Sequence, residues 1–116
     1  MTAALARIVI SVASLEKALA LYEDVLDLRR IRESPGLVGL ALARDVELIL
    51  HERPPTPGDA GVAPTFRVAN VDATVAAATG VGATLLDTPR DEPWGERQAV
   101  IRDVDGHVVC FVTPVN

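Results

Sequence analysis

The chain contains one strand-to-helix junction twice, and this internal repeat constrains the fold more than any other feature. Residues 12–19 read VASLEKAL and residues 68–75 read VANVDATV, an offset of 56 residues (Val12 to Val68) in a chain of 116. Each copy places an N-capping side chain, Ser14 or Asn70, between an apolar strand and an amphipathic helix. Near the end of each half, ARD before VELIL matches IRD before VVCFV. We therefore predict two tandem copies of one structural unit.

Apolar alternation and turn residues define the elements that we expect in each unit. The first half predicts strands over residues 5–12, 29–33, 37–43 and 46–52, with a helix over 14–28. The second half predicts strands over about 63–68, 83–88, 97–103 and 107–113, with a helix from Asn70 to Gly80. Both halves then read βαβββ, which predicts an α+β fold.

A proline-rich stretch separates the halves. Residues 53–64 contain four prolines and two glycines and leave no room for a regular element. We predict a first module over residues 1–52, a linker over 53–62 and a second module over 63–116, together forming one structural domain.

Composition excludes several partners. A net charge of −5, with no basic patch beyond Arg29, Arg30 and Arg32, argues against nucleic acid. With no apolar run of eighteen residues and no basic start before the first apolar run, we expect neither a membrane span nor a secretory signal. The single cysteine, Cys110, cannot form an internal disulfide, so we expect a cytoplasmic protein.

Two longer segments resemble a known family. SLEKALALYEDVLDL follows the first strand and PWGERQAVIRDVDGHVVCFV lies near the end, and together they are similar to the vicinal oxygen chelate superfamily. That superfamily includes glyoxalase I, extradiol dioxygenases, fosfomycin resistance enzymes and bleomycin resistance proteins. The resemblance implies two βαβββ modules whose curved mixed sheets surround a cup, with helices outside and the ligand inside. It also implies a homodimer.

The resemblance also implies where metal ligands would lie. Metal-dependent members take one ligand, usually His, from the first strand of each module and one, usually Glu, from the last. In this chain we expect those positions at Arg7, Glu47, Ala63 and Cys110. An arginine offers no lone pair and an alanine no donor atom, so we expect no bound metal and no cofactor. Arg7 is then expected to pair with Glu47.

Strand alternation separates two faces of each sheet. Ile8, Ile10 and Val12 are expected to face the first helix. Among smaller apolar residues, the opposite, concave face is predicted to present Arg7, Ser11, Glu47, His51, Thr65 and Arg67. A polar sheet face of this kind is also compatible with simple wet surface.

Few individual residues indicate a ligand-binding or catalytic role. Trp94, the only tryptophan, lies in the loop 90–97 among polar, proline and glycine residues. We expect its indole either to contact a ligand at the edge of the cup or to pack against its own loop or a second subunit. His51 lies at a strand end and His107 follows a turn. Cys110 is expected to be a buried thiol rather than a nucleophile, and Tyr22 to be in the core. No catalytic residue is assigned.

Two functions remain open. We favour a metal-independent binding protein, similar to bleomycin and mitomycin resistance proteins, that sequesters an antibiotic or a similar hydrophobic or aromatic ligand. The alternative is a metal-dependent glyoxalase, lyase or dioxygenase of the same superfamily, and a regulatory or structural module is a third possibility. The predicted ligand-binding residues are Arg7, Glu47, Thr65, Arg67 and Trp94.

Overall fold

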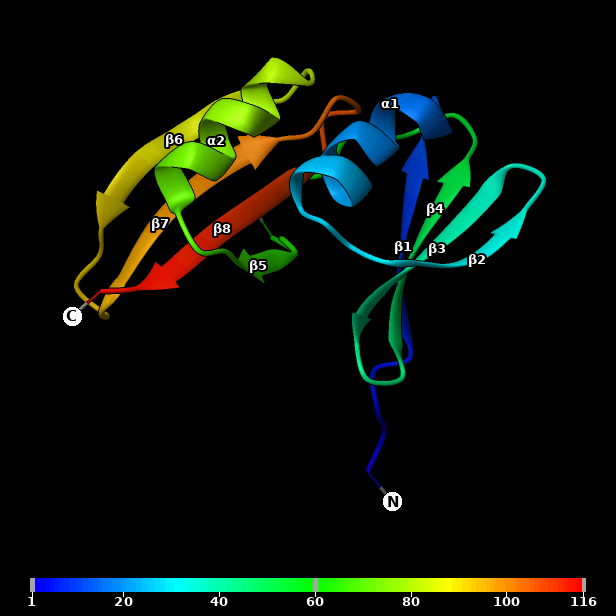
Figure 1. Cartoon of the computed structure of the whole chain (residues 1–116), viewed down its shortest axis with the longest axis horizontal. Helices are drawn as coiled ribbons and strands as arrows, with labels where there is room; N and C mark the ends of the chain where they lie inside the picture. Colours follow the sequence, from blue (N-terminus) through cyan, green and yellow to red (C-terminus); the bar gives the residue numbers. More distant parts are fainter. Residues whose placement is uncertain (1, 60, 116) are drawn as a thin grey trace. The chain divides into compact units, whose positions relative to one another are not determined.

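The computed structural model describes residues 2–59 and 61–115, and the chain divides into two compact units, residues 1–55 and 56–116. The first module contains β1 (Arg7–Val12), α1 (Leu15–Leu19), a π-helical segment η1 (Ala20–Val25), β2 (Arg30–Ser34), β3 (Leu37–Ala43) and β4 (Val46–Glu52). The second contains β5 (Thr65–Arg67), α2 (Val71–Gly80), β6 (Thr84–Asp91), β7 (Glu96–Arg102) and β8 (Val108–Pro114). Figure 1 shows both modules with their helices.

Each module forms one four-stranded mixed sheet. The strand orders are β1-β4-β3-β2 and β5-β8-β7-β6, so the two halves have the same topology. In each sheet the first strand runs parallel to the last, and the other neighbours are antiparallel. A parallel pair needs a long crossover connection, which the helix and the two following strands supply. The predicted α+β fold of two βαβββ modules is confirmed.

The first helix begins as predicted and ends earlier. Ser14 Oγ accepts a hydrogen bond from Lys17 N at 3.3 Å, which caps α1. The expectation of one helix to residue 28 is wrong, because the chain changes to π-helical geometry over Ala20–Val25 and then stops. Asp27 has a φ of 57°, a left-handed conformation that aspartate tolerates and that ends a helix. Tyr22, which lies in η1, is fully buried as expected.

The second helix has the predicted bounds. Asn70 Oδ1 accepts a hydrogen bond from Ala73 N at 2.9 Å, and α2 then runs from Val71 to Gly80. Val71, Val75 and Ala78 are buried on one side of this helix, which packs on β6, β7 and β8. No helix in residues 2–59 and 61–115 combines the length and apolar character that crossing a membrane requires.

Burial alternates along β1 as predicted, whereas in β4 the four residues 47–50 are all buried. In β1, Ile10 and Val12 are buried while Arg7 and Val9 are exposed. Leu48 and Leu50 of β4 are fully buried on the side of the helix, and Phe111 of β8 is the corresponding large core residue of the second module. Each module therefore has its own core between the helix and one face of the sheet.

Several predicted strand ends are wrong by a few residues. β1 begins at Arg7 rather than at residue 5. β5 covers only Thr65–Arg67 rather than 63–68, because Pro64 has no N–H to donate to the ladder. β6 continues to Asp91, beyond the predicted residue 88, since its Pro89 lies on an edge strand where a missing donor costs little.

Candidate functional site

An ion cluster lies on the face of the first sheet that the helix leaves uncovered. Arg7 of β1 and Glu47 of β4 are partners in the parallel ladder, and Arg7 Nε donates to Glu47 Oε1 at 3.1 Å. This bond confirms the predicted pairing. Arg32 of β2 donates to the same carboxylate oxygen, a contact that the sequence analysis missed. The Glu47 side chain is only 11% exposed, whereas each arginine side chain is 51% exposed.

Two backbone features bring Arg32 to this carboxylate. A β-bulge between Arg30 and Arg32 shifts the register of β2 against β3, which re-aims the side chains on either side of it. Between β2 and β4 lies Gly39, where an added Cβ would be 3.1 Å from Glu47 Oε2 and 3.2 Å from Arg32 Cβ. The glycine therefore leaves the room in which Arg32 reaches across β3 to Glu47.

The cluster fixes the protonation state of its carboxylate. Hydrogen bonds from Arg32 and, more weakly, from Arg7 lower the pKa of Glu47 below its usual value, although partial desolvation acts in the opposite direction. The same contact raises the pKa of Arg32. Glu47 is thus a neutralised anion, with two guanidinium groups where a metal ion would need free oxygen lone pairs.

The strand register shows that Glu47 and Cys110 do not occupy equivalent positions in the repeat. Cys110 pairs with Thr65, whereas Glu47 pairs with Arg7. Thr65 is the repeat counterpart of Val9, whose partner is Ile49, so Ile49 rather than Glu47 corresponds to Cys110. The reason is the connection before the last strand, which is residues 44–45 in the first module and residues 103–107 in the second. Aligning the turns therefore does not align the ladders.

The chemistry of the four positions that the resemblance implies as metal ligands argues against a metal. Arg7 offers no lone pair and Ala63 no donor atom, which leaves Glu47, already bound by two arginines, and Cys110. Burial raises the pKa of the Cys110 thiol, although a hydrogen bond with the Thr65 side chain opposes this shift. Within residues 2–59 and 61–115, no three His, Cys, Asp or Glu side chains are grouped to hold a metal ion. The residues do not fit a divalent cation.

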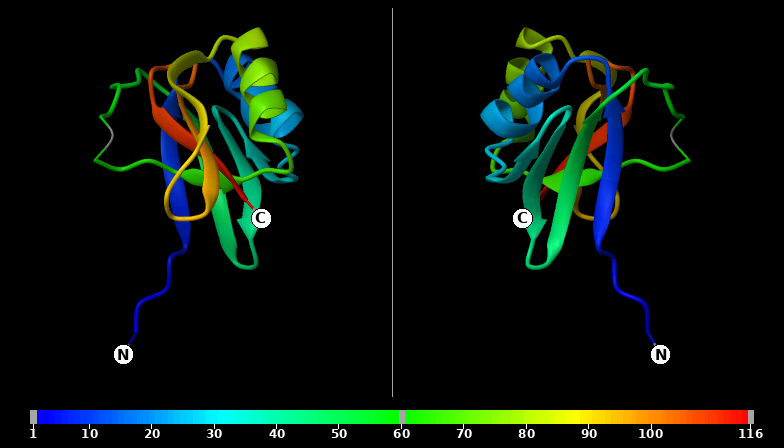
Figure 2. Two further views of the ribbon diagram at one scale, coloured as in Figure 1. Left: turned by 90° about the vertical axis from the view of Figure 1, so that its left-hand side faces the viewer. Right: turned by 90° about the vertical axis from the view of Figure 1, so that its right-hand side faces the viewer.

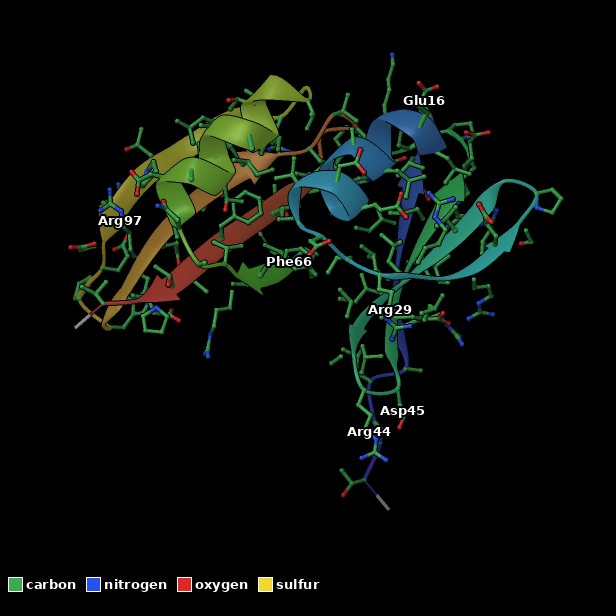
Figure 3. The ribbon with its side chains drawn as sticks, viewed as in Figure 1. Glu16, Arg29, Arg44, Asp45, Phe66 and Arg97 are labelled. Carbon is green, nitrogen blue, oxygen red and sulfur yellow. The ribbon has the colours of Figure 1, made fainter. Side chains whose placement is uncertain are left out.

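A pocket of about 520 Å³ adjoins the ion cluster. It lies where β1 begins and the β3–β4 hairpin turns, two segments that Figure 2 shows at the same end of the sheet. Its polar lining includes both Arg7 and Glu47, together with three residues that the sequence analysis did not assign to a site: Arg29, Arg44 and Asp45. Figure 3 shows Arg44 and Asp45 at the tip of the hairpin and Arg29 where the chain enters β2. In the sequence, Arg29 was marked only by the short basic run at residues 29–32, and Arg44 and Asp45 only by the predicted turn.

The other predicted site residues belong to the second module. Thr65 and Arg67 lie on β5, and both are exposed on the side of that strand opposite Phe66. Trp94 lies in the turn between β6 and β7, is 60% exposed and donates from Nε1 to Glu96 Oε1 at 3.1 Å. In the sheet order, β8 and β7 separate β5 from that turn, so Trp94 is not a neighbour of the β5 residues.

The two histidines lie in different modules. His51 is half-buried at the end of β4 opposite Ser11, on the same face as Glu47. His107 follows the Gly106 turn, and its backbone N–H donates to Asp103 Oδ1 at 2.9 Å. The contact of His51 with a ligand stays a prediction.

Comparison with known proteins gives a family and a fold. The model of the Glyoxalase/Bleomycin resistance protein/Dioxygenase superfamily matches residues 4–111. A family enzyme from Burkholderia phytofirmans has 22% identity and a TM-score of 0.82, covering 97% of this chain and 100% of that one. A glyoxalase-related enzyme from Fulvimarina pelagi has 18% identity and a TM-score of 0.80, covering 95% and 87%. The comparison with curated proteins found no match.

The chain is also similar to a protein that binds antibiotics. TnmS3, described as an antibiotic binding protein from a Streptomyces species, is 27% identical to this chain with a TM-score of 0.72. The alignment covers 97% of each chain. With a family match over nearly its whole length and two βαβββ modules of the same topology, the protein belongs to the Glyoxalase/Bleomycin resistance protein/Dioxygenase superfamily.

Proposed function

We propose that the protein is a metal-independent binding protein that sequesters a small hydrophobic or aromatic molecule, such as an antibiotic, in drug resistance or self-protection. The residues proposed to contact the ligand are Arg7 and Glu47 in the first module and Thr65, Arg67 and Trp94 in the second. We place the protein in the cytoplasm, where its single cysteine, Cys110, stays reduced.

The observation that carries the proposal is the arginine-saturated carboxylate of Glu47. A carboxylate that already accepts from Arg7 and Arg32 is a poor ligand for a hard divalent cation. Of the other three positions that the resemblance implies, Arg7 has no lone pair to offer and Ala63 has no donor atom, so only Cys110 remains. The metal-dependent chemistry of the superfamily therefore has too few donors, whereas ligand binding needs none of them. The likeness to TnmS3, an antibiotic binding protein, supports the same choice.

Elemental analysis tests the metal-independent part of the proposal. The purified chain is loaded separately with Mg²⁺, Mn²⁺, Fe²⁺, Ni²⁺ and Zn²⁺, desalted and measured for metal per chain. We expect well below one equivalent of every metal. One tightly bound equivalent that Glu47→Gln or Cys110→Ala removes would favour the metal-dependent glyoxalase, lyase or dioxygenase instead.

Intrinsic fluorescence tests the binding part, because Trp94 is the only tryptophan. Antibiotics with planar aromatic groups are titrated into the protein, and hits are measured again by calorimetry. Stacking on an indole contributes on the order of 0.5–1.5 kcal/mol beyond burial, so Trp94→Ala should weaken a hit about tenfold or more once the lost contact area is included. The exposed Val62 offers a matched control in Val62→Ala. If Trp94→Ala and Arg67→Ala bind a ligand with the same affinity as the parent, the binding site does not include these residues.

We also propose a homodimer. The strands β1 and β2 are the edges of one sheet and β5 and β6 the edges of the other, and such edges favour pairing or coverage by another chain. Sedimentation at micromolar concentration should give twice the chain mass of 12.3 kDa. A species of the single-chain mass would contradict this part of the proposal without affecting ligand binding.

A further inference from the structure

Two arginines that line the first-module pocket have guanidinium groups without a partner in the described part of the chain. The Arg29 and Arg44 guanidinium groups form no hydrogen bond or ion pair within the described part of the chain. The other arginines of this module all have a partner: Arg7 and Arg32 bind Glu47, Arg30 binds Glu23, and Arg53 binds Ser11. The two unused cations thus share one pocket.

The backbone of both arginines lies in defined structure. Ala41 N donates to Arg29 O at 2.8 Å, which fixes Arg29 against β3 just before β2 begins. Arg44 lies in the two-residue connection between β3 and β4, where Asp45 adopts a φ of 61°. Both side chains therefore extend from ordered backbone beside a strand, rather than from a long loop.

The pocket has a surplus of positive charge. Glu47 is neutralised by Arg7 and Arg32, so Asp45 is the one remaining acidic residue in the lining that also includes the two unused arginines. Two guanidinium groups against one carboxylate give a local positive excess in a chain whose net charge is −5. Such an excess attracts anions and discriminates against cations of similar shape.

The rest of the lining is small and apolar. Ile31, at the β2 bulge, is 46% exposed and lines the pocket together with Ala41, Ala43 and Val46. A volume of about 520 Å³ falls within the range of about 300–1,000 Å³ that is usual for small-molecule sites. The pocket thus combines two guanidinium groups with an apolar surface, and its volume is sufficient for a ligand of one or two aromatic rings.

We propose that this pocket binds a small organic carboxylate, whose anionic group pairs with Arg29 or Arg44 and whose apolar body lies against Ile31 and the alanines of β3. Guanidinium groups match the planar carboxylate with two parallel hydrogen bonds. The inference rests on the proposed binding function, concerns only its first-module contacts Arg7 and Glu47, and adds the chemical class of the ligand and the residues that select it.

A matched pair of probes tests this assignment. Naphthalene-2-carboxylate and naphthalene-2-carboxamide have nearly the same shape and differ in charge. Each is titrated into the ¹⁵N-labelled full chain in the presence of EDTA, and amide shifts give both the affinity and the location. We expect the carboxylate to shift the amides around Arg29, Ile31 and Ala43 and to bind at least tenfold more tightly than the carboxamide. Raising the salt concentration should reduce that ratio.

Variants identify the residues responsible. The double variant Arg29→Gln, Arg44→Gln should lose at least tenfold in carboxylate affinity while the carboxamide affinity stays constant. The control, Lys17→Gln with Arg53→Gln, removes the same charge from outside the pocket and should bind like the parent. Because Arg29 and Arg44 are exposed and unpaired, the double variant should keep the parent's amide dispersion.

Each failure has a different meaning. Equal binding of the two probes in the pocket, or an unchanged affinity in the double variant, overturns the carboxylate assignment and leaves the proposed binding function standing. The absence of any shift in the first module also overturns the assignment. A stoichiometric metal in the loaded protein, by contrast, contradicts the proposed function and is measured independently of these titrations.

Discussion

The two modules share a topology but begin their parallel ladders differently. In the first, Arg7 opens a six-pair ladder from Arg7 opposite Glu47 to Val12 opposite Glu52. In the second, the corresponding residue is Ala63, Pro64 follows it, and the ladder consists of three pairs starting with Thr65 and Cys110. One replacement removes the charge, and the adjacent proline removes a backbone donor.

This difference changes the chemistry of otherwise equivalent faces. The first module presents an ion cluster beside a pocket, whereas the second places Thr65 beside a buried thiol. The helix-facing cores remain alike, with aliphatic residues and one large aromatic side chain, Tyr22 or Phe111. The repeat thus preserves the packing that folds each unit and leaves the other face free to diverge. A duplicated scaffold can lose one chemistry and keep its fold.

The largest effect should come from the cores that the modules share. Phe111 is fully buried in the second module, and Phe111→Ala should lower the free energy of unfolding by about 3–5 kcal/mol. Leu48→Ala in the first module should cost about 2–5 kcal/mol for the same reason. Urea unfolding followed by circular dichroism measures both. A loss below about 1 kcal/mol in either would mean that the corresponding core is not closely packed.

The next effect should separate the modules by pH. Because the pKa of Glu47 is lowered from 4.5, its contribution to stability is complete above that pH and is lost as the pH falls through the folded-state pKa. Glu47→Gln should therefore flatten the acid side of the stability profile. Asp72, whose pKa is lowered from 3.8 mainly by a hydrogen bond from Arg97, is the control in the second module.

Salt sharpens this contrast. The Asp72 side chain is 57% exposed, so 0.5 M NaCl should suppress most of the difference between Asp72→Asn and the parent. The nearly covered Glu47 should retain its effect. We measure the unfolding of both variants between pH 3 and pH 7, with and without the salt. If salt reduces both effects equally, the distinction between the exposed Asp72 and the covered Glu47 is contradicted.

A smaller effect should come from the helix caps that the repeat predicts. Replacing Asn70, whose Oδ1 accepts from Ala73 N at 2.9 Å, with alanine should cost about 1 kcal/mol. Ser14→Ala should cost less, since its bond to Lys17 N is longer at 3.3 Å. Thermal or urea unfolding measures the two differences. The reverse order would show that hydrogen-bond length does not rank the caps.

The smallest effect should come from Trp94. Its side chain is largely exposed in the β6–β7 turn, so Trp94→Ala should change the free energy of unfolding by less than about 0.5 kcal/mol. A loss above about 1 kcal/mol would assign the indole to packing rather than to ligand contact. Combined with a tenfold loss of ligand affinity, the small effect would support the proposed role.

The sequence by itself determined the repeat, both helix starts and the faces of the strands. Ser14 and Asn70 act as caps where predicted, and the alternation in β1 and β4 correctly separated Arg7 and Glu47 from the buried leucines. These features depend on side-chain periodicity and on contacts within a few residues, which a single sequence records directly.

Only the tertiary structure decided which residues meet across strands. Arg32 reaches Glu47 because a bulge shifts β2 and Gly39 leaves space above β3, and neither condition follows from local periodicity. Cys110 corresponds to Ile49 because the two modules have connections of different length before their last strands. Register depends on turn length and bulges, and a shift of two residues keeps the face while changing the partner. The sequence therefore determined the sheet face on which each charged side chain lies. The pairing of strands in the tertiary structure decided which opposite charge neutralises it.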